Sequence, residues 1–184
     1  MPSAFLWAAL TLVLILVMYI IYIFNRLITL KNRAENSLSQ IDVQLKRRYD
    51  LIPNLVNAVK GYMKHEKSVL ENITKARSML VKGSTAEKAK ASNIVSDALK
   101  TLFAVAENYP NLKANENFKM LQEELTGTED KIAYSRQFYN DTIMDFNNRL
   151  QVFPSNIFAN MLGFKQKEFF KTAENEKKPI KVEF

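Results

Sequence analysis

The feature that most limits how this chain folds is an uninterrupted apolar segment close to its N-terminus. From Ala4 to Phe24 the sequence contains no charged residue. As an α-helix this segment is roughly 30 Å long, which matches the hydrocarbon thickness of a bilayer. In lipid, a single apolar segment satisfies its backbone hydrogen bonds only as a helix. The sequence therefore predicts a transmembrane anchor over residues 1–25, with the rest of the chain in water.

The flanks of the apolar segment favour a retained anchor over a cleaved signal peptide. No Lys or Arg precedes the segment, and it does not end in the small residues that a signal peptidase requires. Aromatic residues near both ends suit the two membrane interfaces, although tyrosines also occur in buried helices. The anchor residues that we single out from the span are Trp7, Leu12, Leu16, Tyr19, Tyr22 and Phe24.

Basic residues that follow the span predict its orientation. Arg26, Lys31 and Arg33 lie just after it, and Lys and Arg near a span tend to stay on the cytoplasmic side. We expect a single-pass protein with its N-terminus outside and its helical domain in the cytoplasm. A second basic run, Lys46, Arg47 and Arg48, leaves three interpretations open: a solvated helix face or ion pairs between helices, a partner-binding surface, or contact with lipid headgroups.

The composition of the chain favours long helices and argues against nucleic-acid binding. The formal net charge is +7 and the isoelectric point is about 9.5, but much of the basic excess lies just beyond the span, where it can meet anionic lipid. No aromatic-interleaved basic motif of a nucleic-acid module is present. With only 4 Gly and 5 Pro, the chain has few residues that would interrupt helices.

Apolar residues then recur every three or four positions, which predicts an all-α fold. The spacing from Leu27 to Leu80 predicts one helix over residues 26–82, kinked near Pro53 because proline lacks an N–H. Gly83 suits a left-handed C′ position, and Ser84 with Glu87 forms a capping box that starts the next helix. The expected segments are helices at 85–106, 112–152 and 155–162, which complete an elongated antiparallel bundle over 26–163, and a charged, mobile tail over 164–184.

The longest predicted helices extend beyond the middle one and leave an apolar stripe uncovered between Leu27 and Ile52. Self-association in the membrane plane would cover it by coiled-coil packing. The competing explanation is that the short C-terminal helix and its phenylalanines fold back over the stripe. The residues expected at a homo-oligomer interface are Leu38, Ile41 and Leu45; the phenylalanines of the competing explanation are Phe164, Phe169 and Phe170.

Several motifs resemble those of the bacterial LemA family. The most specific is VQLKRRYDLIPNLV at residues 43–56, and further matches follow at Gly61-Tyr62, His65-Glu66, Ala76-Arg77, in two stretches of the third helix, and at Phe153-Pro154. Tyr49 stands where we expect a small residue. The motif and bundle residues that we single out are Gln44, Asp50, Pro53, Asn54, Glu66, Arg77, Glu129, Arg136, Tyr139 and Asn140.

The resemblance implies a membrane-anchored, mostly helical bundle protein of bacterial origin, from a family without an established catalytic activity. We expect it in the bacterial inner membrane. A similar protein in magnetosome-forming bacteria takes part in building an internal membrane compartment, and some members are encoded near a membrane zinc metallopeptidase. Glu66, Arg77, Glu129 and Arg136 lie near apolar stripes of facing helices. They are therefore expected to form buried ion pairs that fix the register of the helices.

We expect no catalytic residue, no cofactor and no metal site. The chain has a single His and no Cys, and it lacks a glycine-rich phosphate loop or a nucleophile motif. Two non-enzymatic hypotheses remain, and both have membrane lipids as a partner. The first is a scaffold that self-associates and organises or shapes the membrane or envelope. The second is an adaptor that docks another membrane protein, such as a membrane metallopeptidase.

Overall fold

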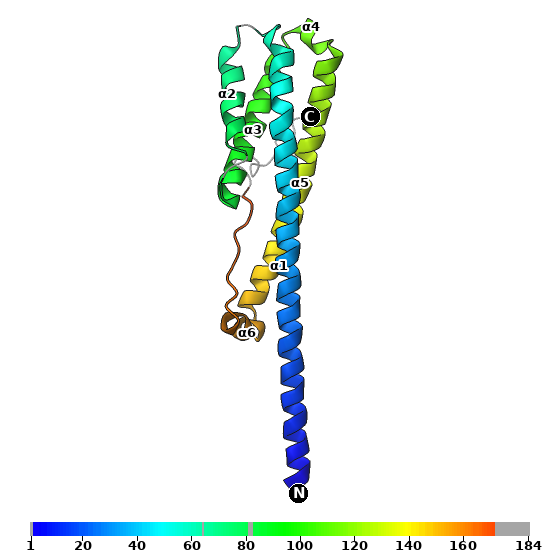
Figure 1. Cartoon of the computed structure of the whole chain (residues 1–184), viewed down its shortest axis with the longest axis vertical. Coiled ribbons are helices and arrows are strands. Elements are labelled where there is room, and N and C mark those ends of the chain that lie inside the picture. Colours follow the sequence, from blue (N-terminus) through cyan, green and yellow to red (C-terminus); the bar gives the residue numbers. More distant parts are fainter. Residues whose placement is uncertain (1, 64, 81–82, 172–184) are drawn as a thin grey trace, which may run out of the picture. The chain divides into compact units, whose positions relative to one another are not determined.

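The all-α prediction is confirmed by a computed structural model, which describes residues 2–63, 65–80 and 83–171 (Figure 1). Every regular element among these residues is a helix, and the first one contains the apolar segment. In chain order the helices are α1 (Pro2–Lys60), α2 (Lys67–Ser78), α3 (Thr85–Ala106), α4 (Pro110–Lys113), α5 (Glu116–Gln151) and α6 (Ser155–Met161).

The helix predicted over 26–82 is two helices. The first, α1, has 59 residues and is continuous from the apolar segment to Lys60. It ends in a turn in which the Tyr62 and Met63 amides both donate to the Val59 carbonyl, at 3.0 and 2.9 Å. Glycine at position 61 weakens the helix at this point. The turn reverses the chain, so that α2 buries Ile73 against the bundle instead of extending the same helix.

The chain divides into two compact units, and this division differs from the predicted domain limits of 1–25, 26–163 and 164–184. Unit 1 consists of Met1–Asn36 with Tyr139–Lys167, and unit 2 of Ser37–Phe138 with the described residues from Glu168 onward. The anchor shares its unit with α6 and the end of α5 because the buried apolar stripe of α1 begins at Ile23, before the charge-free segment ends at Phe24. The buried cluster of unit 1 is formed by Ile23, Leu27, Leu30, Phe146, Leu150 and Ala159.

Unit 2 is an antiparallel helical bundle around the second half of α1. Figure 1 shows α2, α3 and the first part of α5 alongside this half of α1. Four apolar residues on one stripe of α1, Ile41, Leu45, Ile52 and Leu55, are fully or almost fully buried. Amphipathic helices bury such stripes against each other to remove apolar surface from water. The core partners from the other helices include Ile73, Val95, Leu102, Leu125 and Ile132.

Helix α3 has the same limits as the predicted helix at 85–106. Its N-cap is Ser84, whose side chain accepts from the Glu87 amide while the Glu87 carboxylate accepts from the Ser84 amide at 2.7 Å. The residue before the cap, Gly83, has a φ of +114°, in the left-handed region that was expected of it. However, α2 ends at Ser78, so this glycine leads into the cap of α3 and does not terminate α2.

The first part of the segment predicted to be a mobile tail is packed. The Phe164 ring lies 6.3 Å from that of Phe24 and 6.2 Å from that of Phe146. Further on, Phe170 is fully buried, whereas Phe169 is exposed. The fold-back considered as an alternative to self-association therefore occurs for α6, Phe164 and Phe170. The rest of the predicted tail, residues 172–184, lies outside the described residues.

Candidate functional site

The apolar segment of α1 is exposed on all sides from Ala4 to Met18, and only its last turns contact other residues of unit 1. By length and composition it is the one helix in the described part of the chain that could cross a membrane, and none of its apolar window is buried. Trp7 is 70% exposed, and Leu12, Leu16, Tyr22 and Phe24 are also exposed; Tyr19 lies against α6. Apolar surface of this extent requires an apolar environment. Of the basic residues that follow, Lys31 and Arg33 are exposed and Arg26 is half-buried.

A polar cluster lies inside unit 2, centred on the Arg48 side chain, which is fully buried. Its guanidinium forms an ion pair with Glu129 of α5. It also donates from Nη1 to the Ser92 carbonyl oxygen at 3.2 Å and lies 3.3 Å from the Ser92 and Ser96 hydroxyls of α3. Ser96 in turn donates to Glu129 Oε1 at 2.8 Å. One α1 side chain thereby joins α3 and α5.

A second arginine, Arg136 of α5, extends this cluster. Its Nη2 donates to Asn93 Oδ1 at 3.0 Å, and its guanidinium lies 4.9 Å from the centre of the Phe170 ring. Burial, and secondarily the positive charge of Arg136, lower the pKa of Arg48 to about 9. Arg48 is still charged at neutral pH, so its ion pair with Glu129 is needed to compensate the loss of hydration.

The remaining predicted ion-pair residues have cross-helix partners other than each other. Arg77 of α2 donates from Nε to the Tyr49 carbonyl oxygen at 2.8 Å, and its guanidinium lies 3.7 Å from the centre of the Tyr49 ring. Glu66, before α2, accepts a hydrogen bond from the Tyr109 hydroxyl at 3.4 Å. These contacts tie α2 and the segment before α4 to the bundle, although the partners differ from the expected ion pairs.

The contact between Arg77 and Tyr49 satisfies a backbone group that Pro53 leaves free. Proline at position 53 has no N–H to donate to the carbonyl four residues earlier, which is that of Tyr49. The arginine supplies the missing donor, and α1 continues through the proline. The tyrosine, which replaces an expected small residue, provides the ring on which this arginine stacks.

The basic run at residues 46–48 is engaged by carboxylates of the same chain. Lys46 pairs with Asp50 at 2.6 Å, and Arg47 with Glu124 of α5, while Arg48 belongs to the buried cluster. Of the three interpretations left open, ion pairing within the bundle is the one that these contacts support. The other motif residues lie in the bundle at different depths: Tyr139 is buried, Gln44, Pro53 and Asn140 are half-buried, and Asn54 is exposed.

The residues expected at a homo-oligomer interface belong largely to the core. Ile41 and Leu45 are almost completely buried by the chain's own side chains, and Leu38 is half-buried. The uncovered stripe from which this interface was inferred is therefore not present in the single chain. Self-association itself stays a prediction, and it would have to use other side chains.

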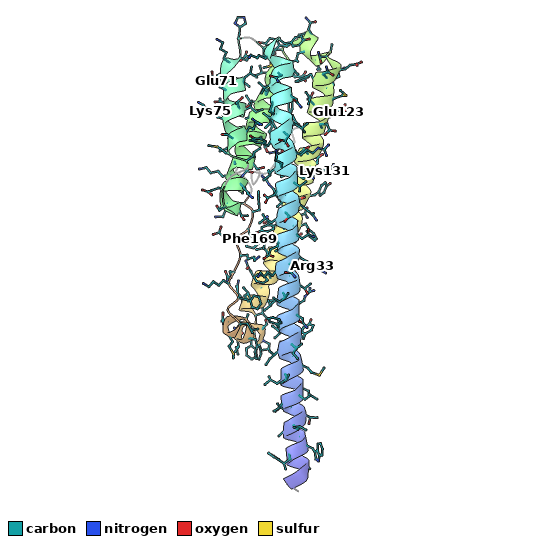
Figure 2. The ribbon with its side chains drawn as sticks, viewed as in Figure 1. Arg33, Glu71, Lys75, Glu123, Lys131 and Phe169 are labelled. Carbon is teal, nitrogen blue, oxygen red and sulfur yellow. The ribbon has the colours of Figure 1, made fainter. Side chains whose placement is uncertain are left out.

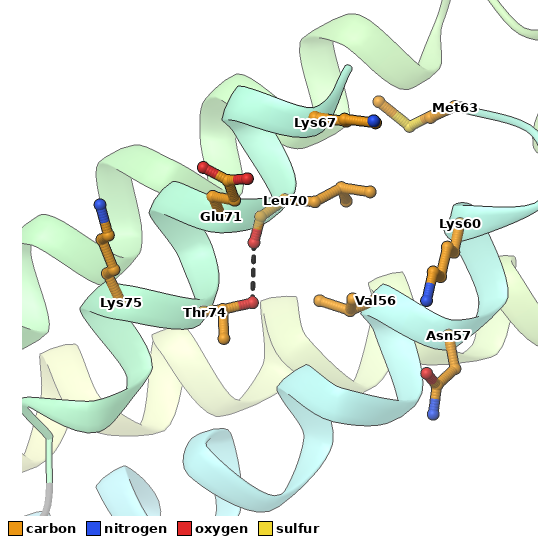
Figure 3. Close-up of a pocket in the computed structure, with 9 residues that line it drawn as sticks. All are labelled: Val56, Asn57, Lys60, Met63, Lys67, Leu70, Glu71, Thr74 and Lys75. Carbon is orange, nitrogen blue, oxygen red and sulfur yellow. Dashed lines mark hydrogen bonds between the residues drawn. The ribbon is translucent and has the colours of Figure 1, made fainter. Parts of the chain in front are cut away.

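A groove of about 810 Å³ separates the end of α1 from α2 (Figure 3). Its apolar lining side chains are Val56, Met63 and Leu70. Three of the lining residues are lysines and one is acidic. These charged residues are Lys60, Lys67, Lys75 and Glu71.

No group of three or more His, Asp or Glu side chains in the described part of the chain could hold a metal ion. His65, the single histidine, is exposed in the turn before α2. The polar cluster around Arg48 is a packing element: Arg48 pairs with Glu129 and donates to α3, and Ser96 donates to Glu129, while the buried Arg48 Nε has no hydrogen-bond partner among the described residues.

Sequence reasoning missed that Arg48 is the centre of the polar core. The signal was present, because position 48 lies three residues after Leu45 and four before Ile52, both of which are buried. A stripe drawn only through apolar residues passes through the neighbouring Tyr49 instead, and an arginine in a basic run is typically solvated. The complementary signal was a pair of serines four residues apart on α3, Ser92 and Ser96, at positions that would otherwise be apolar.

Comparison with known proteins identifies the family of this chain. The LemA family profile matches residues 37–184. A protein named LemA from Metamycoplasma hominis is 28% identical over 168 residues, which cover 88% of this chain and 75% of that protein. Magnetosome protein MamQ 2 of Paramagnetospirillum magneticum is 25% identical over 184 residues, covering 85% and 68% of the two chains. MamQ of Magnetospirillum gryphiswaldense is 25% identical over 174 residues, covering 80% and 64%. With its exposed apolar helix and a family match over most of its length, this chain is a membrane-anchored protein that belongs to the LemA family.

Proposed function

We propose that this protein is a non-enzymatic scaffold that is tethered to the bacterial inner membrane and self-associates there through its helical bundle. The observation that carries the proposal is the continuity of α1, in which a largely exposed apolar span is part of the same 59-residue helix as residues of the bundle core. Such a chain holds a protein surface near the bilayer. The names of the MamQ relatives refer to magnetosomes and support a role in organising a membrane structure.

The surface proposed for self-association lies on α1 and α5 of unit 2. Val43 of α1 is 63% exposed and Tyr134 of α5 is 74% exposed, and both line a groove of about 380 Å³. On the same helix as Tyr134, Glu123 and Lys131 provide exposed charges of opposite sign (Figure 2). Exposed apolar side chains among mixed charges are typical of an interface between proteins.

Cross-linking of single cysteines tests this surface, because the natural chain contains no Cys. Val43→Cys in native membranes should form dimers and larger products with a short bis-maleimide. The matched control is Ile94→Cys, an exposed β-branched residue on α3, which should stay monomeric. Dimers in neither variant, together with a monomeric particle in mild detergent, would contradict self-association.

An adaptor role is the second candidate, and the groove between α1 and α2 favours it. The groove has apolar lining residues and more lysines than acidic residues, which suits an acidic, amphipathic segment of another membrane protein, such as a metallopeptidase. Lys67→Glu should then reduce co-purification of a tagged metallopeptidase from the same membranes. Lys100→Glu on α3, an exposed lysine outside the groove, should not. Equal recovery with both variants would reject the groove as the docking site.

A further inference from the structure

The corner formed by the end of α5 and α6 lies beside the apolar span. Within unit 1, the Phe158 ring of α6 is 6.2 Å from that of Tyr19, and the Phe164 ring is 6.3 Å from that of Phe24. Both α1 partners belong to the charge-free segment. Farther along the chain, Lys167 reaches Glu35 at 3.3 Å, so the segment after α6 returns along α1 away from the span.

The length of the span requires the bilayer to reach the level of α6. If hydrocarbon ended below Tyr19, the helix from Ala4 to Met18 would provide only about 22 Å, whereas a bilayer core needs about 30 Å. The full segment to Phe24 provides this length. Because Tyr19 lies about 7.5 Å before Phe24 along the helix, the α6 corner sits at the boundary between headgroups and acyl chains.

The composition and exposure of the corner suit that depth. From Gln151 to Phe164 the sequence contains no Asp, Glu, Lys or Arg, and Arg149 and Lys165 flank this stretch. Three large apolar side chains spaced four residues apart point away from the protein core. They are Phe153 (75% exposed), Ile157 (48%) and Met161 (78%).

Backbone carbonyls of the corner are also hydrogen-bonded within the chain, as backbone groups in contact with lipid must be. The Ser155 hydroxyl lies 2.7 Å from the Arg149 carbonyl oxygen and 2.8 Å from that of Val152, at the end of α5. At the other end of α6, the Phe164 amide donates to the Ala159 carbonyl at 3.1 Å. The carbonyls of Arg149, Val152 and Ala159 therefore have partners within the chain.

We propose that α6 and the turn before it form a second membrane contact, a short in-plane wedge in which Phe153, Ile157 and Met161 insert among lipid acyl chains. The occupant of this apolar surface is lipid because the surface is continuous with the span. The flanking Arg149 and Lys165 then lie at the level of the headgroups. This inference rests on the anchored position of α1 that the proposed function also uses, but not on self-association.

Depth-dependent quenching tests the wedge in the full-length protein, reconstituted in phosphatidylcholine and phosphatidylglycerol vesicles at a low protein-to-lipid ratio. A fluorescent maleimide at Met161→Cys should show a blue-shifted emission and be quenched by doxyl-labelled lipid at least half as strongly as the same label at Leu12→Cys in the span. The matched control is Met120→Cys on α5, another exposed methionine, which should not be quenched.

The outcomes separate this inference from the proposed function. Quenching at Leu12→Cys with none at Met161→Cys would overturn the wedge and leave the anchor in place. No quenching at either position would overturn both. Cross-links between Met161→Cys copies without quenching would assign the surface to a second copy and also reject the lipid contact. As a second measurement, Ile157→Asn with Met161→Asn should reduce quenching at a Val152→Cys label several-fold, while the Leu12→Cys signal is unchanged.

Discussion

The Arg77 side chain connects α2 to the turn of α1 in which Pro53 supplies no backbone N–H. Pro53 removes the amide that would bond to the Tyr49 carbonyl, and the Arg77 guanidinium donates to that oxygen at 2.8 Å. A hydrogen bond from a charged donor contributes about 1.5–3 kcal/mol, and stacking on the Tyr49 ring adds to it. Arginine is suited to this position because one planar group both donates and stacks.

The loss of stability caused by replacing Arg77 should therefore depend on whether residue 53 is proline. Arg77→Ala should reduce the free energy of unfolding by about 2 kcal/mol in the natural chain. In a Pro53→Ala background the new amide can bond to the Tyr49 carbonyl, and the same replacement should cost about 1 kcal/mol less. Urea unfolding of the four proteins of this double-mutant cycle, in mild detergent, measures the coupling. Additive effects would show that the arginine does not substitute for the missing amide.

The buried ion pair at Arg48 leads to a second prediction at this scale. Glu129→Gln leaves the charge of Arg48 buried without a carboxylate and should lower the free energy of unfolding by about 3 kcal/mol. Adding Arg48→Met to Glu129→Gln also removes the buried positive charge, so this double variant should lose less free energy of unfolding than Glu129→Gln alone. The matched control is Glu124→Gln, which breaks the exposed pair with Arg47 and should change stability by less than about 1 kcal/mol. Equal losses for the two glutamate variants would show that burial of the pair is unimportant.

At the scale of the helices, the start of α3 depends on one glycine and one cap. A Cβ at Gly83 would lie 2.6 Å from Glu87 Oε2, and the φ of +114° is unfavourable for any other residue. Gly83→Ala should therefore destabilise the protein by about 1 kcal/mol, as should Ser84→Ala. Gly61→Ala is the control, because a Cβ there meets nothing within 4 Å. Thermal unfolding followed by circular dichroism compares the three, and a loss at position 61 equal to that at 83 would contradict the argument.

The same cap gives the stability a pH dependence. Hydrogen bonds from the Ser84 amide and then from its hydroxyl lower the pKa of Glu87 below its ordinary value of 4.5. The carboxylate therefore stabilises the fold above about pH 4.5, and this contribution is lost as the pH falls through the lower pKa of the folded state. Glu87→Gln should show a shallower loss of stability between pH 5 and pH 3 than the natural chain, measured by urea unfolding at each pH. Parallel pH profiles would exclude the contribution.

How well each helix can be predicted depends on how local its signals are. The limits of α3 follow from the capping box at its start and from the turn at Asn108-Tyr109-Pro110 after its end. Both signals act within a few residues. The break after Lys60 could not be predicted, because the stripe keeps its phase on both sides of it and the turn is stabilised by burial of Met63. For the polar core, the types of Glu129 and Arg136 pointed to buried ion pairs. Their partners come from residues 33 to 81 positions away, and spacing alone does not identify them.

For the whole molecule, the position of the bundle relative to the membrane is the property on which any partner depends. Arg26, Lys31 and Arg33 follow the span and should keep unit 2 in the cytoplasm. A Ser68→Cys variant, exposed at the start of α2, should therefore resist a membrane-impermeant maleimide in intact spheroplasts and react in inverted vesicles. Reaction in intact spheroplasts would place unit 2 outside the cytoplasm and exclude cytoplasmic partners.

The repair of α1 by an arginine of α2 sets an order on folding during synthesis. Tyr49 leaves the ribosome 28 residues before Arg77 does. Until Arg77 has been synthesised, the Tyr49 carbonyl has no hydrogen-bond donor within the chain, and the turns of α1 beyond Pro53 can fray. We therefore expect the end of α1 to become stable only when α2 packs against it. A nascent chain stalled before α2 should expose the part of α1 after Pro53 to chaperones and proteases.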